Sequence, residues 1–208
     1  MFYYLPKGAI MNKYLLALGL LSITNLANAN LITNGSFEDT HQAAGTWSVY
    51  SSINGWSTTR GDGIEIRNNV YGTAQDGVNF VELDSNNNSA MKQIVASTFG
   101  ASYDLSFYYS PRIDQPSSTN GIKVFWDDTL LDAITASGAG LSNNNWVMYT
   151  FNVIGTGSDG LKFAAFGTND SLGGNIDNVS LTPTPIPAGI WLLASGLGFL
   201  GFGSRKSI

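Results

Sequence analysis

Two closely spaced pairs of carboxylic acids are the first candidates for chemistry in this sequence. They are Glu82 with Asp84, and Asp127 with Asp128. Hydrolysis of a glycosidic bond uses two carboxyl groups that flank the bond. Residues i and i+2 share one face of a strand, so Glu82 and Asp84 are expected to point the same way. The chain holds 15 acidic residues, however, and such pairs arise by chance, so we predict no enzymatic activity.

Other catalytic groups are scarce. His41 is the one histidine, and it falls in a polar stretch that predicts a solvated loop. No Gly-x-Ser-x-Gly motif is present, and a metal site with two histidines is excluded. The absence of cysteine excludes disulfides, thiolate metal sites and a cysteine nucleophile.

Aromatic side chains point to a second kind of chemistry, the binding of sugars. Aromatic rings pack against the apolar face of a sugar, while amides and carboxylates bond to its hydroxyl groups. Trp56, in a Gly-Trp pair, and Trp126, in a strand pattern, are expected in the core. The candidate glycan-binding residues are Trp47, Tyr50, Tyr71 and Tyr108, which fall where loops or an outer face are expected. The sequence leaves open whether they line a groove.

The charge balance of residues 30–182 limits the partners. Four of the ten basic residues of the chain lie outside this range, which leaves six against 15 acidic residues and a formal net charge of −9. Such a surface repels nucleic acid and anionic lipid, so we expect no nucleic-acid partner.

The first 29 residues carry the pattern of a secretion signal. Lys13 is a short basic region, residues 14–23 are apolar, and Ala27-Asn28-Ala29 is a small-x-small cleavage site. The mature protein is therefore expected to begin near Asn30. Residues 1–10 fit no part of this pattern, which favours Met11 as the true start.

The last 26 residues, 183–208, read as a membrane anchor. Residues 186–204 carry no charge and are followed by the basic pair Arg205 and Lys206. A helix of roughly 19 residues reaches about 28 Å, close to the ~30 Å core of a bilayer. Positive charge after the segment favours a cytoplasmic C-terminus. The alternative is a buried core helix.

This ending resembles the PEP-CTERM sorting signal of Gram-negative bacteria that export polysaccharide. Pro185, Ile186, Pro187 and Ala188, followed by the apolar run, are most similar to its Val-Pro-Leu-Pro-Ala variety. The resemblance implies a transient inner-membrane anchor, an exosortase-like processing enzyme as partner, and export to the cell surface or extracellular space. Ile186 stands where the Pro-Glu-Pro form has glutamate, which leaves cleavage open.

Residues 30–182 are long enough for one domain with a core of its own. Apolar and polar residues alternate with period two in several short runs: 64–67, 78–83, 103–110, 122–127, 146–153 and 161–166. Clusters of Gly, Asn, Asp and Ser separate these runs. Alternation of this kind predicts an all-β fold, an antiparallel β-sandwich.

The two ends of this domain carry its most specific motifs. Residues 31–38 (Leu-Ile-Thr-Asn-Gly-Ser-Phe-Glu) and 174–181 (Gly-Asn-Ile-Asp-Asn-Val-Ser-Leu) resemble the first and last strands of galactose-binding-like jelly rolls. With the motifs between them, the order is similar to the choice-of-anchor C group of bacterial surface proteins. The resemblance implies a non-catalytic jelly roll that binds extracellular polysaccharide. The alternative is a structural matrix or adhesion protein that binds other proteins or itself.

The jelly-roll resemblance also implies a structural calcium ion where the first loop meets the last strand. Carried over to this chain, the carboxylates are Glu38 and Asp177, and Asn34 and Ser36 are the nearby oxygen donors. Calcium takes six to eight oxygen ligands, so backbone carbonyls must complete the shell.

Overall fold

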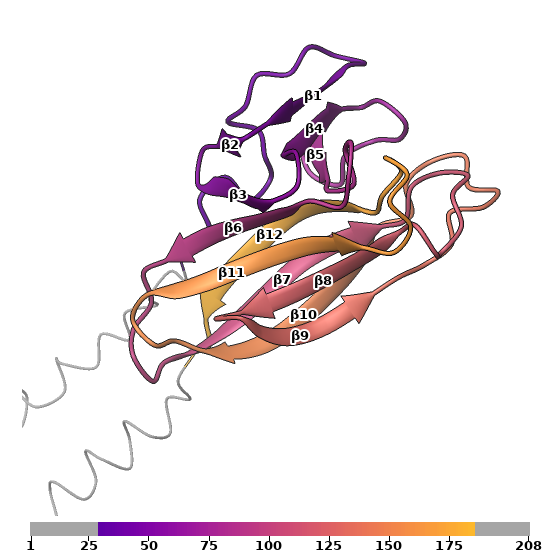
Figure 1. The fold of residues 1–208 in the computed structure, drawn as a ribbon. Helices are drawn as coiled ribbons and strands as arrows, with labels where there is room; N and C mark the ends of the chain where they lie inside the picture. Colours follow the sequence, from indigo (N-terminus) through magenta and orange to yellow (C-terminus); the bar gives the residue numbers. More distant parts are fainter. Residues whose placement is uncertain (1–28, 186–208) are drawn as a thin grey trace, which may run out of the picture.

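The computed structural model describes residues 29–185 of the chain (Figure 1). The predicted signal peptide, apart from Ala29, and the predicted membrane helix at 186–204 lie outside these residues. Pro185 of the sorting motif is described, whereas Ile186, Pro187, Ala188, Arg205 and Lys206 lie outside. Residues 29–185 contain no helix with the length and apolarity needed to cross a bilayer.

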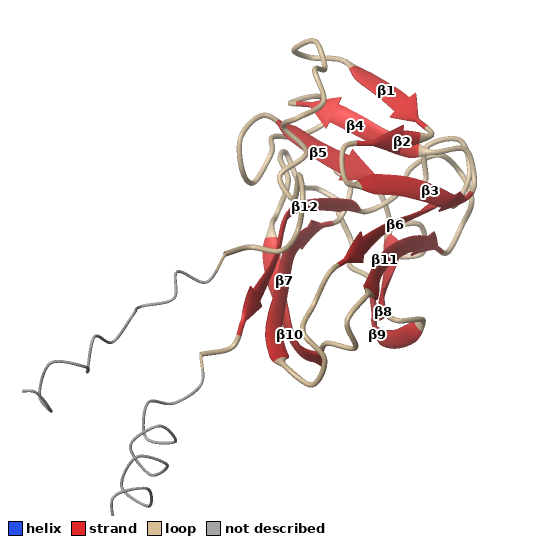
Figure 2. Cartoon of the chain, turned by 90° about the vertical axis from the view of Figure 1, so that its left-hand side faces the viewer, coloured by secondary structure: helices blue, strands red, loops and turns tan. Residues whose placement is uncertain are grey.

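Between residues 29 and 185, twelve β-strands form two antiparallel sheets that pack face to face (Figure 2). Sheet I contains, in spatial order, β1 (Trp47–Tyr50), β4 (Ile64–Asn68), β5 (Asn79–Glu82), β12 (Asn175–Pro183), β7 (Ser102–Ser110) and β10 (Val147–Ile154). Sheet II contains β2 (Ser52–Ile53), β3 (Trp56–Arg60), β6 (Ala90–Val95), β11 (Asp159–Phe166), β8 (Gly121–Trp126) and β9 (Thr129–Ile134). The predicted all-β antiparallel sandwich is confirmed.

The core lies between the sheets, where alternate residues of each strand meet. Along β7, Leu105 and Phe107 are fully buried, whereas the residues between them are half-buried on the outward face. Phe107 of sheet I meets Phe163 of sheet II edge to face, with ring centroids 4.9 Å apart. Trp56 and Trp126 are 1% and 6% exposed, so their predicted place in the core is confirmed.

The first predicted strand, residues 31–38, is not a β-strand in the structure, although the segment lies beside the last strand as predicted. Residues 31–38 make turns instead of a strand, because Asn34 and Phe37 have φ values of 53° and 63°. The segment still runs beside β12: Leu31 N donates to Leu181 O at 2.9 Å. A methyl group on Gly35 would overlap the Val179 carbonyl oxygen, so this close approach requires glycine.

The centre of sheet I is buried on both faces. All residues of β4 and β5 are buried, although the sequence predicted alternation there. Loops cover the outward face: the Trp146 ring contacts Phe80 at 5.8 Å, and its Nε1 donates to the Thr73 carbonyl at 3.0 Å. Polar residues of β4 and β5 are therefore enclosed rather than solvated.

Candidate functional site

A cluster of four buried charges lies on the outward face of β4 and β5, under the covering loops. Glu65 and Arg67 come from β4, Glu82 from β5, and Arg112 from the loop after β7. Arg67 Nε donates to Glu65 Oε1 at 2.7 Å, and Arg112 Nη1 donates to Glu82 Oε2 at 2.7 Å. Arg67 Nη2 also contacts Glu82 Oε2. Burial raises the pKa of Glu82, and the two guanidinium groups oppose that rise.

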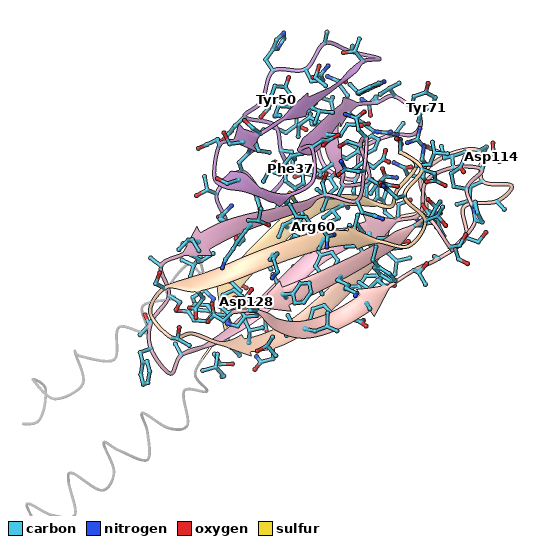
Figure 3. The ribbon with its side chains drawn as sticks, viewed as in Figure 1. Phe37, Tyr50, Arg60, Tyr71, Asp114 and Asp128 are labelled. Atoms are coloured by element: carbon cyan, nitrogen blue, oxygen red, sulfur yellow. The ribbon has the colours of Figure 1, made fainter. Side chains whose placement is uncertain are left out.

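A pocket of about 190 Å³ opens onto this cluster. Its lining residues are Trp47, Glu65, Arg67, Tyr71, Ser85, Asn86, Arg112 and Ser171. Both guanidinium groups lie over the Tyr71 ring, at 5.4 Å for Arg67 and 5.1 Å for Arg112. Trp47 and Tyr71 are 47% and 58% exposed and present their rings to solvent. Figure 3 shows Tyr71 at the end of the molecule where long loops gather.

One hydrogen-bond donor of this pocket has no protein partner. Arg67 is 2% exposed, and its Nη1 bonds to no atom of the part of the chain that the structure describes. A buried donor without a partner is costly, and for a guanidinium it is an unused site for an anionic oxygen. Two exposed rings beside such donors can bind a ligand that has both a flat apolar face and oxygen atoms.

The predicted glycan-binding residues are divided by the fold. Trp47 and Tyr71 line the same pocket. Tyr50 packs against the core and donates its hydroxyl to Gln42 Oε1 at 3.0 Å. Tyr108 is half-buried on β7, between Asp177 of β12 and Met148 of β10. The structure therefore brings two of the four together.

Sequence reasoning missed Arg67 and Arg112. Neither belongs to a motif, and they come from different strands and loops. The sequence offered one indication. Residues 30–182 contain six basic residues, so a basic residue within an alternating apolar run, such as Arg67, is unusual enough to suggest a specific role.

Three of the four acids in the candidate catalytic pairs, Asp84, Asp127 and Asp128, contact residues that are distant in the sequence. Asp84 is fully buried, accepts the Asp170 N–H at 3.2 Å, and burial raises its pKa. Asp127 and Asp128 form the β8–β9 turn with positive φ values. Asp127 accepts the Gly160 N–H at 2.7 Å, and Asp128 pairs with Lys162 Nζ at 2.7 Å.

Two of the four predicted calcium residues, Glu38 and Asp177, bind backbone N–H groups at or next to the connection between β4 and β5, residues 69–78. Glu38 Oε1 accepts the N–H groups of residues 78 and 79, at 2.8 and 2.7 Å. Asp177 Oδ2 accepts those of residues 75 and 76, at 2.7 and 3.0 Å. Asn34 Oδ1 accepts the Asp39 N–H at 3.1 Å, while Ser36 lies beside it in the same turn.

The side-chain and carbonyl oxygens near Glu38 and Asp177 are of the type that calcium binds. Residues 29–185 hold no cluster of three acidic or histidine side chains that would suit a metal. Oxygen ligands are nevertheless close by: the carbonyls of Phe37 and Thr40 both accept from Asn79 Nδ2 at 3.0 Å. Asn79 Oδ1 is buried and has no hydrogen-bond partner in the described part of the chain. Asp177 is fully buried, and burial raises its pKa to about 7. A cation beside it would stabilise the carboxylate.

No family model matches the chain. A multifunctional-autoprocessing repeats-in-toxin protein of Vibrio vulnificus is 30% identical over 154 residues, which is 72% of this chain and 3% of the toxin. The corresponding toxin of Vibrio cholerae is 29% identical over 157 residues, again 3% of its length. The chain therefore spans a small segment of these curated relatives.

Solved structures share the fold. A Stig cyclase, FisC of Fischerella sp. TAU, matches with a TM-score of 0.54 and 16% identity over 76% of this chain and 99% of the cyclase. An arabinose-bound α-L-arabinofuranosidase, MgGH51, matches with a TM-score of 0.51 and 13% identity over 76% of this chain and 27% of the enzyme. A family 35 carbohydrate-binding module from an environmental isolate matches 68% of this chain and 99% of the module with a TM-score of 0.44 and 17% identity, a likeness too weak to assign a ligand.

Proposed function

We propose that this protein is an exported, non-catalytic protein that binds extracellular polysaccharide through the pocket between Trp47 and Tyr71. One observation carries the proposal: two exposed aromatic rings lie beside a buried guanidinium nitrogen that has no partner among residues 29–185. Protein sites for sugars combine these elements, because the ring contacts the apolar face of the sugar and the donors bind its oxygens.

The ligand that fits the pocket is a sugar residue with a carboxylate. Arg67 and Arg112 both line the pocket, so two guanidinium groups supply positive charge for a carboxylate there. Charge-assisted bonds from arginine to a carboxylate are among the stronger hydrogen bonds in proteins. The volume of about 190 Å³ is below the ~300–1,000 Å³ of typical ligand pockets, so it suits one sugar residue of a chain.

Calcium belongs to this proposal as a structural ion. Glu38 and Asp177 would hold it, with the carbonyl oxygens of Phe37 and Thr40 and the side chains of the Asn34–Ser36 turn nearby. The ion would supply positive charge to two carboxylates whose hydrogen bonds within residues 29–185 all come from backbone N–H groups. Both carboxylates hold the connection 69–78, which also carries Tyr71 at the pocket mouth. A brace there would keep Tyr71 in position for the ligand.

The location in the cell follows from the two terminal signals. We propose secretion through the N-terminal signal, brief anchoring in the inner membrane by residues 186–204, processing by an exosortase-like enzyme, and display at the cell surface. The similarity to a sorting signal of polysaccharide exporters supports an exopolysaccharide as the ligand class.

A second candidate function is binding to other proteins or to a second copy of the chain. It is favoured by β10, an edge strand of sheet I on which Met148 and Ile154 are 57% and 53% exposed. Exposed edge strands with apolar side chains are templates for pairing with another chain.

The test uses purified full-length chain and short galacturonate oligosaccharides in titration calorimetry, with calcium and then with a chelator. Tyr71→Ala is expected to weaken binding by about five- to thirtyfold, since an aromatic stacking contact contributes roughly 1–2 kcal/mol. Tyr108→Ala is the matched control, because Tyr108 lies outside the pocket. Equal affinities of the two variants would contradict the site assignment. If the folded protein bound none of the polysaccharides tested, the second candidate function, binding to other proteins, would be favoured.

A further inference from the structure

The six basic residues of the domain lie in two places. Arg67 and Arg112 are in the pocket of sheet I. The other four belong to adjacent strands of sheet II: Arg60 on β3, Lys92 on β6, Lys162 on β11 and Lys123 on β8. The domain as a whole has a formal net charge of −9, yet four of its six basic residues lie on one sheet. A local cluster of positive charge on an acidic protein favours an anionic ligand.

The strand register places the four cations in two neighbouring rows on the outward face. Lys92 is directly opposite Lys162, and Phe125 continues that row. Arg60 and Lys123 stand at the two ends of the next outward row, with Ala90 and Ala164 between them. Strands lie about 4.8 Å apart, so the cations follow one another across the sheet at short intervals. Figure 3 shows Arg60 on this face, with Asp128 further along it.

The face is hollowed along these rows. A concavity of about 370 Å³ is lined by Thr59, Arg60, Ala90, Lys92, Phe125, Asp128, Lys162 and Ala164. Its floor is made of small residues, since Ala90 and Ala164 are 4% and 6% exposed. A methyl group on Gly160 would overlap the Lys92 side chain, so glycine lets Lys92 lie along the sheet. The small side chains leave room for a chain to cross the sheet.

The positive charges on this face are mostly unneutralised. Lys162 pairs with Asp128, which is the acidic residue that lines the concavity. Lys92 and Lys123 make no ion pair with any residue between 29 and 185. Like charges directly opposite on neighbouring strands, as in Lys92 and Lys162, are destabilising. An arrangement that costs stability in the free protein is explained if an anionic ligand relieves it.

Aromatic rings and fixed donors accompany these charges. Lys162 Nζ lies 4.3 Å from the centre of the Phe125 ring, and Lys123 Nζ lies 5.2 Å from that of Phe166. Arg60 is held by backbone carbonyls, because its Nη2 donates to Ala165 O at 2.7 Å. The face therefore offers cations in defined positions beside flat apolar surface.

We propose that the outward face of sheet II is a second binding surface, which takes an extended anionic polysaccharide with about one acid group per sugar. The inference goes beyond the pocket, since the two surfaces belong to different sheets. Sugar rings fit the apolar floor and the phenyl rings, and their acid groups meet the lysines. Duplex DNA fits less well, because it carries a charge every ~1.7 Å and the domain is strongly acidic elsewhere.

The test measures the affinity of purified full-length chain for long-chain alginate at two salt concentrations. The variant is Lys92→Gln with Lys123→Gln, which removes two charges that form no ion pair within residues 29–185 and keeps a polar, unbranched side chain of similar size. The matched control is Ser142→Glu with Thr150→Glu; it lowers the net charge equally at exposed positions outside sheet II. We expect the lysine variant to bind about two- to thirtyfold more weakly, with a shallower salt dependence, and the control to bind nearly as wild type.

Four outcomes would overturn the proposal: unchanged affinity of the folded lysine variant, an equal loss in the control, equal binding of wild type to neutral dextran, or tighter binding to duplex DNA at the same salt concentration. A thermal melt of each variant separates loss of binding from loss of fold. Galacturonate dimers report on the pocket alone, so Tyr71→Ala should weaken the dimer and the lysine variant should not. Failure of the second surface is thereby distinguished from failure of the pocket.

Discussion

Glu38 and Asp177 come from opposite ends of the domain sequence and bind backbone N–H groups of one loop. Glu38 accepts two of them, from residues 78 and 79, and Asp177 accepts two from residues 75 and 76. The same connection carries Tyr71, which lies at the pocket mouth. The two ends of the domain therefore hold the loop that presents a ligand-binding residue.

Replacing Glu38 tests this role. Glu38→Ala leaves two N–H groups without their acceptor, and we expect a loss of about 1 kcal/mol in the free energy of unfolding, or a Tm lower by roughly 2–4 °C. If calcium binds there, the increase in Tm caused by calcium should also disappear. Asp132→Ala is the control, since Asp132 is exposed on β9 and its carboxylate accepts the N–H of the next residue, Ala133, far from this loop. Unchanged Tm and unchanged calcium response in Glu38→Ala would show that Glu38 is not a brace.

The pH dependence of stability tests the burial of Asp177. Its folded pKa of about 7 lies above the unfolded value of 3.8, so the folded state binds more protons between pH 4 and 7. Stability from this group therefore falls as the pH rises through that window. Asp177→Asn should show a shallower fall in denaturant unfolding. Calcium should stabilise the wild type more at pH 8 than at pH 6, because Asp177 with a pKa of about 7 is mostly ionised at the higher pH. Identical pH slopes for wild type and variant would contradict this account.

Removing one arginine tests the buried charge cluster. Arg112→Met leaves Glu82 with one guanidinium partner in a fully buried site, and we expect a loss of about 3–5 kcal/mol at pH 9, where Glu82 is ionised. The loss should shrink as the pH falls from 9 toward 7, because burial raises the pKa of Glu82 to about 8 and a protonated Glu82 needs less compensation. The double variant Glu82→Gln/Arg112→Met should be more stable than Arg112→Met alone. A double variant as unstable as the sum of its parts would argue against coupling between the two side chains.

A glycine substitution tests the contact between the chain's first segment and β12. Gly35→Ala places a methyl group against the Val179 carbonyl, and we expect a cost of about 1–3 kcal/mol. Gly45→Ala is the control: its φ is +70°, but nothing lies within 4 Å of the added methyl, so the cost should be about 1 kcal/mol. Equal costs measured by urea unfolding would mean that the segment moves away freely.

The nature of the fold was readable in the sequence because strand periodicity is local. The runs at 103–110 and 161–166 became β7 and β11, and Trp56 went to the core as expected. The alternation failed at β4, where both faces are buried. Whether an outward face is solvated depends on loops from elsewhere in the chain, and no local pattern encodes their arrangement.

The candidate site was readable only in part. Of the aromatic residues expected in loops or on an outer face, Trp47 and Tyr71 line one pocket, and their role in glycan binding stays a prediction. The same signal included Tyr50, whose ring packs on the core. Arg67 and Arg112 were missed, because a guanidinium becomes part of a site only when the fold buries it beside another charge.

The sequence by itself determined the composition and local pattern: an acidic chain without cysteine, short alternating runs, and few basic residues. These properties dictate a β-sandwich, since alternation can bury apolar side chains on one face only by packing against a second sheet. The tertiary structure alone decided which polar residues meet. Arg67 and Arg112 lie under Tyr71, and the remaining four cations line one outward face, because strand order brings distant segments side by side.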